Sequence, residues 1–288
     1  HGPPEERLGF FGPTLGVGGQ GHTYRAKDRS TGAAVAVKEI SLGGGGGWKA
    51  FDLFERECTV LRSLDHPGIP DFLDTYADDE AGRFYLVMEL VEGTSLQELM
   101  REQRLLPEAQ LWNILHQSLE IVGYLHGLRP PVIHRDIKPA NLIRRPDGSL
   151  ALVDFGGVRV ALREDGGSTV VGTFGFMAPE QLHGEATEAT DIYGLGATLA
   201  TMATGTDADK LPRKGLRIDL DPVMPATALR QLLQQMLEPD PEQRLRTVAQ
   251  VREAIQASST TSRGARRGPT PRDEGAPRAD APPAHDDP

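Results

Sequence analysis

The chemistry open to this chain is constrained most by two short segments, His134-Arg135-Asp136-Ile137-Lys138-Pro139-Ala140-Asn141 and Asp154-Phe155-Gly156. The first aspartate can take a proton from a hydroxyl group, and the asparagine after it can hold a metal ion. The second aspartate can hold metal that is bound to phosphate. Phosphoryl transfer needs little more covalent machinery, because the protein mainly positions the reactants and neutralises their charge. The alternative, a polar surface turn, would have to match all these positions by chance, so the two segments predict a site for phosphoryl transfer.

A glycine-rich stretch near the start, Gly16-Val17-Gly18-Gly19-Gln20-Gly21, fits the pattern G-x-G-x-x-G. Alone it is a weak signal, because the pattern also opens dinucleotide-binding folds and occurs in ordinary glycine-rich turns. A dinucleotide site needs a helix directly after the loop and an acidic residue about 20 residues further on. Here residues 23–26 and 35–40 are predicted strands, and the second strand carries Lys38. A glycine loop between strands, followed by a lysine on a strand, favours binding of nucleotide phosphates.

Lys38 is the candidate partner of the α- and β-phosphates, and a glutamate on a helix is expected to orient it. A lysine that ends a strand is usually a solvated surface residue, but its flanking Val-Ala-Val and the later motifs argue for a functional role here. Residues 49–64 have apolar side chains at roughly helical spacing. Glu57 on this predicted helix is the favoured partner of Lys38. Glu55 remains the alternative, because only one face of the helix can point towards the site.

Residues 8–256 as a whole resemble the catalytic domain of the eukaryotic-type (Hanks-type) serine/threonine protein kinases. The motifs occur in that family's order, which is the glycine loop, Lys38, His134 to Asn141, Asp154-Phe155-Gly156 and Ala178-Pro179-Glu180. The resemblance implies an α+β, two-lobed fold. Residues 8–90 would form an N-terminal antiparallel β-sheet lobe with one key helix, and residues 91–256 a mainly α-helical C-terminal lobe. The abundance of Ala, Gly, Pro and Arg favours a bacterial source.

The resemblance implies a role for four residues in the segments 134–141 and 154–156. Asp136 is the expected catalytic base, which accepts the proton of the substrate hydroxyl or orients that hydroxyl. Lys138 would neutralise the phosphoryl group during transfer. Asn141 and Asp154 are expected to carry Mg²⁺, or Mn²⁺ in its place.

The resemblance also implies an ATP site. Its expected residues are Leu15, Gly16, Val17, Gly18, Gly19, Gln20, Gly21, Thr23, Ala36, Lys38, Met88, Glu89, Val91 and Ile143. Met88 is the expected gatekeeper, and the backbone of Glu89 and Val91 is expected to bind the edge of the adenine. Thr23 stands where the family usually has Val, so we expect weaker apolar packing over the adenine and no loss of function.

Further positions match residues that support catalysis and substrate choice in this family. Asp191 matches the aspartate that braces the catalytic loop from below, and Arg244 matches the arginine that pairs with Glu180. Lys138-Pro139 after the catalytic aspartate is typical of the Ser/Thr-specific branch. Thr173 matches the threonine that hydrogen-bonds to the catalytic aspartate and lysine in that branch. The resemblance therefore favours serine and threonine over tyrosine as phosphate acceptors.

Regulation through the activation segment, the stretch that begins at Asp154, is a further hypothesis. In similar kinases the positions of Arg135 and Arg159 clamp a phosphorylated residue of this segment. Thr169 occupies the matching place, and Ser168 is the neighbouring alternative. A phosphate there could order the segment by pairing with the arginines. The competing interpretation is an exposed Ser-Thr pair without a role.

The span from Thr206 to Pro225 departs from the family pattern. The family normally has a helix there that docks protein substrates, whereas this span is short and polar and contains Pro212 and Pro222. Because proline interrupts helices, we expect the docking helix to be truncated or missing. The family's usual way of recruiting substrates is therefore not carried over to this chain.

Composition sets the remaining expectations. Residues 257–288 lack Leu, Ile, Val and Phe, so we expect a disordered tail or linker rich in Pro, Ser, Thr, Arg and Asp. A formal net charge of −10 argues against nucleic acid as a partner. Cys58 is the single cysteine, which excludes an internal disulfide, and no apolar run of about 18 residues predicts a membrane segment. We expect a cytoplasmic location, either of a free protein or of the cytoplasmic domain of a membrane receptor kinase.

Two other functions compete with an active protein kinase. A pseudokinase, acting as a regulatory nucleotide-binding module, would typically lack one of Lys38, Asp136, Asn141 or Asp154, and all four are present. A small-molecule kinase would lack the peptide-binding segment that ends at Ala178-Pro179-Glu180. The expected partners are therefore ATP and a protein that carries Ser or Thr, with self-association for autophosphorylation as a further expectation.

Overall fold

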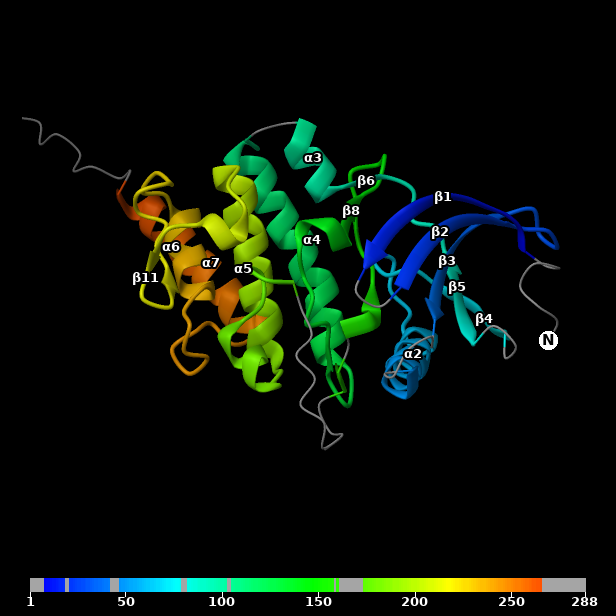
Figure 1. The fold of residues 1–288 in the computed structure, drawn as a ribbon. Coiled ribbons are helices and arrows are strands. Elements are labelled where there is room, and N and C mark those ends of the chain that lie inside the picture. Colours follow the sequence, from blue (N-terminus) through cyan, green and yellow to red (C-terminus); the bar gives the residue numbers. More distant parts are fainter. Residues whose placement is uncertain are drawn as a thin grey trace, which may run out of the picture.

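The structure of the chain, a computed structural model, describes residues 8–18, 21–41, 47–78, 82–102, 105–157, 159–160 and 173–265. Within these ranges the chain forms a β-sheet lobe at the N-terminal end and a mainly helical lobe after it (Figure 1). This arrangement confirms the predicted α+β, two-lobed architecture. Four residues of the predicted site, Gly19, Gln20, Ser168 and Thr169, lie outside the described residues.

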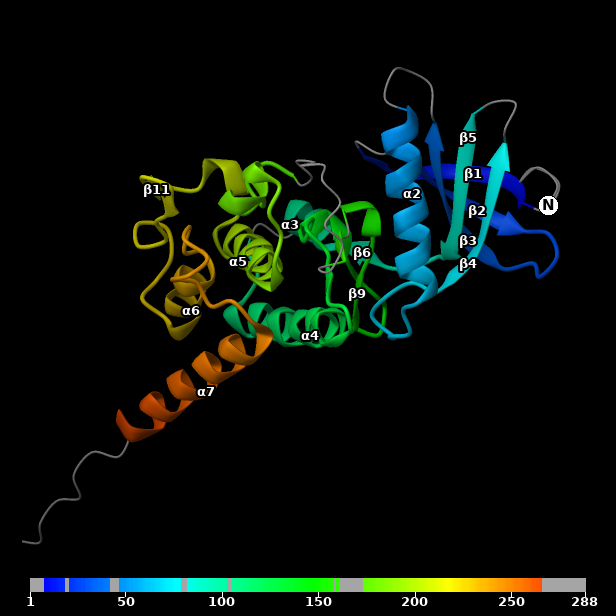
Figure 2. The same cartoon turned by 90° about the horizontal axis from the view of Figure 1, so that it is seen from below.

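A five-stranded sheet in the order β1-β2-β3-β5-β4 makes the N-terminal lobe, and every neighbouring pair is antiparallel. Its strands are β1 (Leu8–Gly18), β2 (Gly21–Asp28), β3 (Ala34–Ser41), β4 (Phe72–Asp78) and β5 (Arg83–Glu89). The helix α2 (Gly47–Arg62) contacts β3, β4 and β5 and stands beside the sheet in Figure 2. It is the helix predicted over residues 49–64.

The central strand β3 is buried on both faces, which explains its nearly continuous apolar sequence. Val35 and Val37 belong to an apolar cluster on one face of the sheet. Ala36 and Ile40 belong to the main core, which also contains side chains of α2 and of the C-terminal lobe. Since successive side chains of a strand point to opposite faces, Lys38 lies on the face of Ala36 and Ile40. The strand thus places one charged side chain in the apolar layer between the sheet and α2.

Helices form most of the C-terminal lobe. The α-helices are α3 (Leu96–Glu102), α4 (Glu108–Gly127), α5 (Glu188–Thr204), α6 (Ala228–Met236) and α7 (Val248–Ala265). The buried side chains of α4 recur with the 3.6-residue period of a helix, so they form one apolar face. Pro107 directly precedes the first helical residue of α4. The helix α5 is buried along most of its length and contacts both α4 and α6.

Short strands and 3₁₀-helices form part of the connections between these helices. One small sheet has the order β6-β8-β9, formed by β6 (Thr94–Ser95), β8 (Leu142–Arg144) and β9 (Leu150–Leu152). Another pairs β7 (Val132–Ile133) with β10 (Arg159–Val160). The 3₁₀-helices near the site are η1 (Pro139–Asn141), η2 (Phe155–Gly157) and η3 (Pro179–His183). These elements hold the segment from His134 to Asn141 next to the segment from Asp154 to Gly156.

The span from Thr206 to Pro225 contains no α-helix. It forms the 3₁₀-helix η4 (Ala208–Lys210) and a hairpin of β11 (Arg213–Lys214) and β12 (Arg217–Ile218). Gly215, in the turn of the hairpin, has a φ of +63°, which favours glycine there. The absence of a docking helix, which the prolines predict, is therefore confirmed for this span. A hairpin occupies its place in the chain.

The last helix, α7, differs from the prediction, because it continues through Ala265 beyond the expected boundary near residue 257. Its first turns are anchored in the core, where Val251 is fully buried and Val248 is nearly so. A helix that is already nucleated adds residues at little entropic cost, even when they are polar. Composition alone therefore places the end of regular structure too early. None of the helices in the described ranges is long and apolar enough to cross a membrane.

Candidate active site

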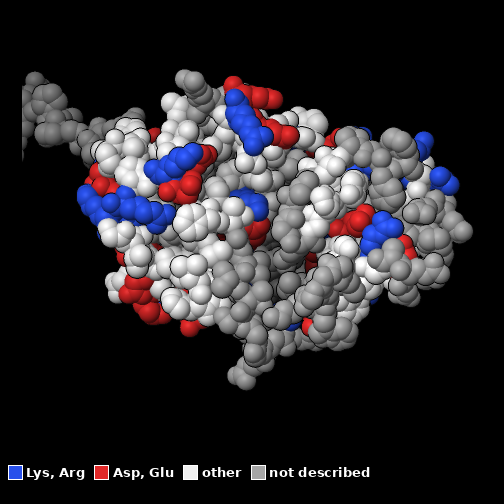
Figure 3. Space-filling view, in the orientation of Figure 1, with Lys and Arg blue, Asp and Glu red and all other residues white. Residues whose placement is uncertain are grey.

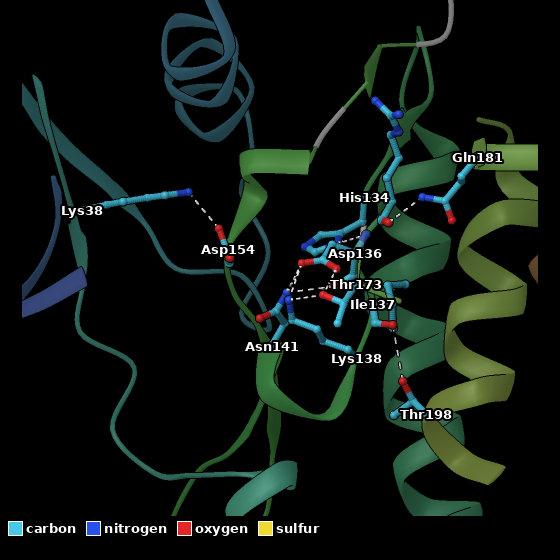
Figure 4. Close-up of polar contacts among 11 residues, drawn as sticks. Lys38, His134, Asp136, Ile137, Lys138, Asn141, Asp154, Thr173, Gln181 and Thr198 are labelled. Atoms are coloured by element: carbon cyan, nitrogen blue, oxygen red, sulfur yellow. Dashed lines mark hydrogen bonds and ion pairs between the residues drawn. The ribbon is translucent and has the colours of Figure 1, made fainter. Parts of the chain in front are cut away.

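Lys38 connects three separate parts of the chain. Its Nζ lies 2.9 and 2.8 Å from the two carboxylate oxygens of Glu57 on α2, and 2.8 Å from Oδ1 of Asp154. Glu57 is 1% exposed, so this ion pair is almost free of water. Glu55, the alternative partner, is exposed on α2. The structure therefore brings Glu57 to Lys38, and Lys38 in turn joins the N-terminal lobe to the segment that begins at Asp154 (Figure 4).

Charge attraction favours the ionised forms of Lys38 and Asp154, whereas burial raises the pKa of Glu57 against the attraction of Lys38. Burial disfavours the ammonium group of Lys38, but the nearby carboxylates of Glu57 and Asp154 outweigh burial and raise its pKa. The charge of Lys38 in turn lowers the pKa of Asp154 to about 2, against the opposing effect of burial. At neutral pH the cluster therefore presents a cation and an ionised carboxylate at the opening between the sheet and the helical lobe.

The carboxylate of Asp136 is held by three neighbours (Figure 4). Lys138 donates to its Oδ2 at 2.7 Å, and the hydroxyl of Thr173 donates to its Oδ1 at 2.9 Å. Lys138 also donates to the Thr173 hydroxyl at 2.6 Å. Asn141 Nδ2 donates to the backbone oxygen of Asp136 at 2.8 Å and to its Oδ2 at 3.1 Å. This network sets the carboxylate in one orientation and leaves a cation beside it.

Two residues of the site have backbone conformations that side chains rarely adopt. Arg135 has a φ of +70° and Asp154 a φ of +65°. Such conformations raise the free energy of the folded state by about 1–3 kcal/mol each, and they persist only when the surroundings hold them. Phe155, which follows Asp154, is 1% exposed and packs its ring edge-on against His134, with 4.9 Å between ring centroids. This apolar contact ties the start of the activation segment to the catalytic loop.

The catalytic loop rests on the buried carboxylate of Asp191 near the start of α5. Its Oδ2 accepts the backbone N–H of His134 at 2.9 Å, and its Oδ1 accepts the backbone N–H of Arg135 at 2.8 Å. His126, at the end of α4, places Nε2 2.9 Å from the same Oδ2. Burial opposes the charge of Asp191, but these hydrogen bonds outweigh it and lower its pKa. The contact with His126 has no local sequence signal, because α4 and α5 meet only in the folded chain.

A second buried ion pair closes the activation segment. Arg244 donates to both carboxylate oxygens of Glu180, at 2.7 and 3.0 Å. It also donates to the backbone oxygens of Ala189, Glu238 and Pro239. The pairing implied by the resemblance is thus present, and it lies in a part of the core without exposed charge.

The expected adenine residues gather along β1, β2, β3, β5 and β8. Ala36 pairs in register with Met88, which is 6% exposed, and Thr23 pairs with Lys38. Leu15, on β1, is 49% exposed. The remaining expected residues are placed as follows, with Gly16, Val17 and Gly18 at the end of β1, Gly21 at the start of β2, Glu89 at the end of β5, Val91 just after it, and Ile143 on β8.

The glycine at the start of β2 is required by its surroundings. Gly21 has a φ of +143°, and a Cβ there would collide with the backbone oxygen of Glu39 on β3. Because Gly21 has no Cβ, the start of β2 can approach β3 more closely than it could with any other residue at this position. This explains one glycine of the G-x-G-x-x-G pattern by packing within the sheet.

The two arginines of the regulatory hypothesis are brought near each other by the backbone. Arg159, on β10, pairs in register with Ile133 on β7, two positions before Arg135. The side chain of Arg135 is almost fully buried. The phosphate acceptors of the hypothesis, Thr169 and Ser168, fall outside the described ranges, so their distance from the arginines is not part of this geometry.

The metal-binding expectation fits the donor set. The described residues hold no cluster of three or more His, Cys, Asp or Glu that could enclose an ion. Mg²⁺ does not require one, because it is often bound by one or two protein ligands together with water and substrate phosphates. Asn141 and Asp154 lie on adjacent segments, since the N–H of Val153 donates to the backbone oxygen of Asn141. Their amide and carboxylate oxygens are of the hard type that Mg²⁺ prefers.

Several charged side chains outside the site form ion pairs within the described residues. On the described part of the face in Figure 3, lysines and arginines lie in separate groups, several of them beside acidic side chains. The ion pair of Lys214 and Asp219, whose charged atoms are 2.9 Å apart, is one example of such pairing at the surface.

Comparisons with known proteins agree with this geometry. The family described as "Protein kinase domain" matches residues 11–256. Serine/threonine-protein kinase F of Synechocystis sp. is 37% identical over 218 residues, which cover 68% of this chain and 44% of that protein. Serine/threonine-protein kinase B of the same organism is 33% identical over 262 residues, covering 84% and 45%. Serine/threonine-protein kinase PrkC of Bacillus subtilis is 32% identical over 195 residues, covering 66% and 29%. The chain spans less than half the length of each of these relatives.

Proposed function

The chain belongs to the protein kinase domain family, and on that premise we propose that it is a serine/threonine protein kinase, which transfers the γ-phosphoryl group of ATP to protein hydroxyls. The observation that carries this proposal is the contact of both Lys138 and Thr173 with the carboxylate of Asp136. It puts a base, a cation and a segment able to hold peptide at one point. The relatives named as serine/threonine-protein kinases support the same substrate class.

The reaction follows from the positions of these side chains. The substrate hydroxyl would lie against Asp136, which accepts its proton as the oxygen attacks the γ-phosphorus. The bond from that phosphorus to the bridging oxygen breaks, and ADP leaves with the bonding electrons. Lys138 stabilises the charge on the phosphoryl group in transit, and Lys38, oriented by Glu57, would hold the α- and β-phosphates. Mg²⁺ bound by Asn141 and Asp154 would neutralise phosphate charge.

The same proposal includes regulation through the activation segment. A phosphate on Thr169 or Ser168 would pair with Arg135 and Arg159 and order the segment that presents the substrate. The pairing of β7 with β10 supports this idea. Arg159 lies on β10 opposite Ile133 of β7, and Arg135 follows Ile133 by two residues. Phosphorylation between two copies of the chain would be the simplest source of this phosphate.

Mass spectrometry after incubation with ATP and Mg²⁺ tests the proposed function. We expect the parent to gain phosphate, with part of it mapped to Thr169 or Ser168, and Asp136→Asn to gain none. Asp136→Asn keeps the size of the side chain and removes the base, which contributes about 10²- to 10⁴-fold to such reactions. Phosphate in both proteins would point to a contaminating kinase. Absence of phosphate in both, with ATP-dependent thermal stabilisation, would favour the pseudokinase alternative.

Replacing the two glutamates of α2 separately tests the role of the Lys38–Glu57 pair. Glu57→Gln should lower the initial rate of phosphoryl transfer by roughly 10- to 100-fold, because Lys38 then turns towards Asp154 alone and loses its orientation. Glu55→Gln on the same helix is the matched control and should keep about the parent rate, since Glu55 is exposed. Initial rates with dephosphorylated casein and labelled ATP measure both variants. Equal rates for the two variants would remove the proposed role of Glu57.

A further inference from the structure

The side-chain amide of Gln181 joins two segments that meet at the reaction site. Gln181 lies on η3 and is 1% exposed. Its Oε1 accepts the backbone N–H of Ala178 at 2.8 Å, and its Nε2 donates to the backbone oxygen of Arg135 at 2.9 Å. Figure 4 shows the side chain reaching from η3 towards the catalytic loop. The amide therefore links the end of the activation segment to the residue just before Asp136.

The bond to Arg135 acts on the peptide group that positions the proposed base. The backbone oxygen of Arg135 belongs to the same peptide plane as the N–H of Asp136. Arg135 itself is held in a left-handed conformation, with a φ of +70°. Asp191 binds its N–H from below, and Gln181 binds its C=O from the side of η3. With both polar groups of this residue fixed, the peptide plane that leads into Asp136 has one orientation.

A separate contact shows that the two segments are coupled at the reacting carboxylate. Thr173, in the same segment as Ala178, donates to Oδ1 of Asp136. Thr173 thus connects the activation segment to the side chain of Asp136, and Gln181 connects it to the backbone that carries Asp136. If the segment moved relative to the loop, the bond made by Gln181 would have to break or rotate the peptide plane.

We propose that Gln181 is a positioning residue for phosphoryl transfer, which couples the place of the activation segment to the orientation of Asp136. This inference rests on the proposed function. Gln181 contacts neither Lys38 nor Glu57, so the nucleotide side of the site is independent of it. Its loss should therefore lower kcat and leave KM for ATP close to that of the parent.

The chain offers a matched control in Gln117 on α4. Its Oε1 accepts the N–H of Leu150 at 2.9 Å, and its Nε2 donates to the oxygen of Gly148 at 3.2 Å. Gln117→Met therefore removes two hydrogen bonds of the same kind as those lost in Gln181→Met, one accepted from a backbone N–H and one donated to a backbone oxygen. These bonds lie at a turn away from Asp136. We expect Gln181→Met to lose kcat on the order of 10- to 100-fold, as small misplacements of reacting groups do. Gln117→Met should keep the parent kcat, although both variants lose stability to denaturant.

The pH profile of Gln181→Glu separates positioning from mere support of the fold. A protonated carboxyl has one O–H donor and one carbonyl acceptor, so it can reproduce both bonds of the amide. The ionised form has acceptors only and repels the backbone oxygen of Arg135. Because burial raises the pKa of a carboxyl group, the ratio of its kcat to that of the parent should be near one at about pH 6 and fall by about pH 9. Gln181→Met should stay low throughout.

Charged groups on the elements that meet Gln181 are the same in all these proteins, so the ratio to the parent removes their titration. They are Arg135 on the catalytic loop, Glu180 and His183 on η3, Asp191 on α5, and Arg244, which pairs with Glu180. A ratio for Gln181→Glu that does not change with pH would overturn the proposal. So would a kcat for Gln181→Met equal to that of Gln117→Met.

Hydrogen exchange gives a readout that does not need catalysis. In Gln181→Met the amides of residues 132–138 should exchange faster than in the parent, and in Gln117→Met they should not. If the parent and Asp136→Asn both fail to transfer phosphate, the proposed function fails, and this measurement still decides whether Gln181 holds the catalytic loop. Parent-like exchange in Gln181→Met would overturn the inference whatever the activity.

Discussion

Lys38→Met is expected to lower the rate of phosphoryl transfer on the order of 10²- to 10³-fold, the usual effect of removing one preorganised stabilising charge. The same change should destabilise the fold. Glu57, which is 1% exposed, would lose the cation that pairs with it in the described part of the chain, and would either stay ionised in an apolar layer or take up a proton. Removing one partner of a buried ion pair typically lowers the free energy of unfolding by about 3–5 kcal/mol.

A double variant separates these two effects. Lys38→Met combined with Glu57→Gln removes the unpaired charge, so it should regain part of the lost stability in denaturant unfolding. It should regain no activity, because the phosphate-binding cation is still missing. Lys27→Met on the neighbouring strand is the control, since Lys27 is exposed and should affect neither quantity strongly. A double variant that recovers activity would contradict the role given to Lys38.

Arg244→Met should produce a large loss of stability. Arg244 and Glu180 have side chains that are 0% and 6% exposed, and Arg244 donates five hydrogen bonds in all. The replacement leaves a buried carboxylate and several backbone oxygens without donors. We expect the free energy of unfolding to fall by about 3–5 kcal/mol.

An exposed ion pair nearby provides the comparison. Arg246 lies 2.9 Å from Glu242, with side chains that are 48% and 72% exposed. Arg246→Met should therefore cost only about 0–1 kcal/mol in the same denaturant titration. Adding Glu180→Gln to Arg244→Met should restore part of the stability by neutralising the stranded charge. Similar losses for the two arginine variants would show that burial does not set the strength of the Glu180 pair.

The sequence was most predictive where chemistry and periodicity pointed the same way. The choice of Glu57 over Glu55 follows from the helical period of residues 49–64, and the structure brings Glu57 to Lys38. The alternation in β3 required one face for Lys38 and the other for Val35 and Val37. In both cases a local pattern determines which side of an element a charge occupies, so no long-range contact is needed to infer it.

Contacts between distant elements that no motif marks were the part that the sequence did not reveal. His126 and Gln181 look like ordinary polar residues in the sequence, and their contacts arise only when α4, α5 and η3 pack together. The helix α3 has a local signal in the sequence instead. Ser95 and Glu98 form a capping box, in which the side chain of each accepts the backbone N–H of the other. The positive φ of Asp154, in contrast, has no local signal, because an aspartate occurs in many backbone conformations.

The buried helix α5 serves as a shared frame for both halves of the reaction. Gly194 lies so close to the catalytic loop that a Cβ there would be 3.1 Å from the backbone oxygen of Ile137 and 3.7 Å from that of Phe176 in the activation segment. Thr198 on the same helix donates to the oxygen of Ile137 (Figure 4). We therefore expect a displacement of α5 to shift the loop that carries Asp136 and the activation segment in the same direction, as a common-mode motion.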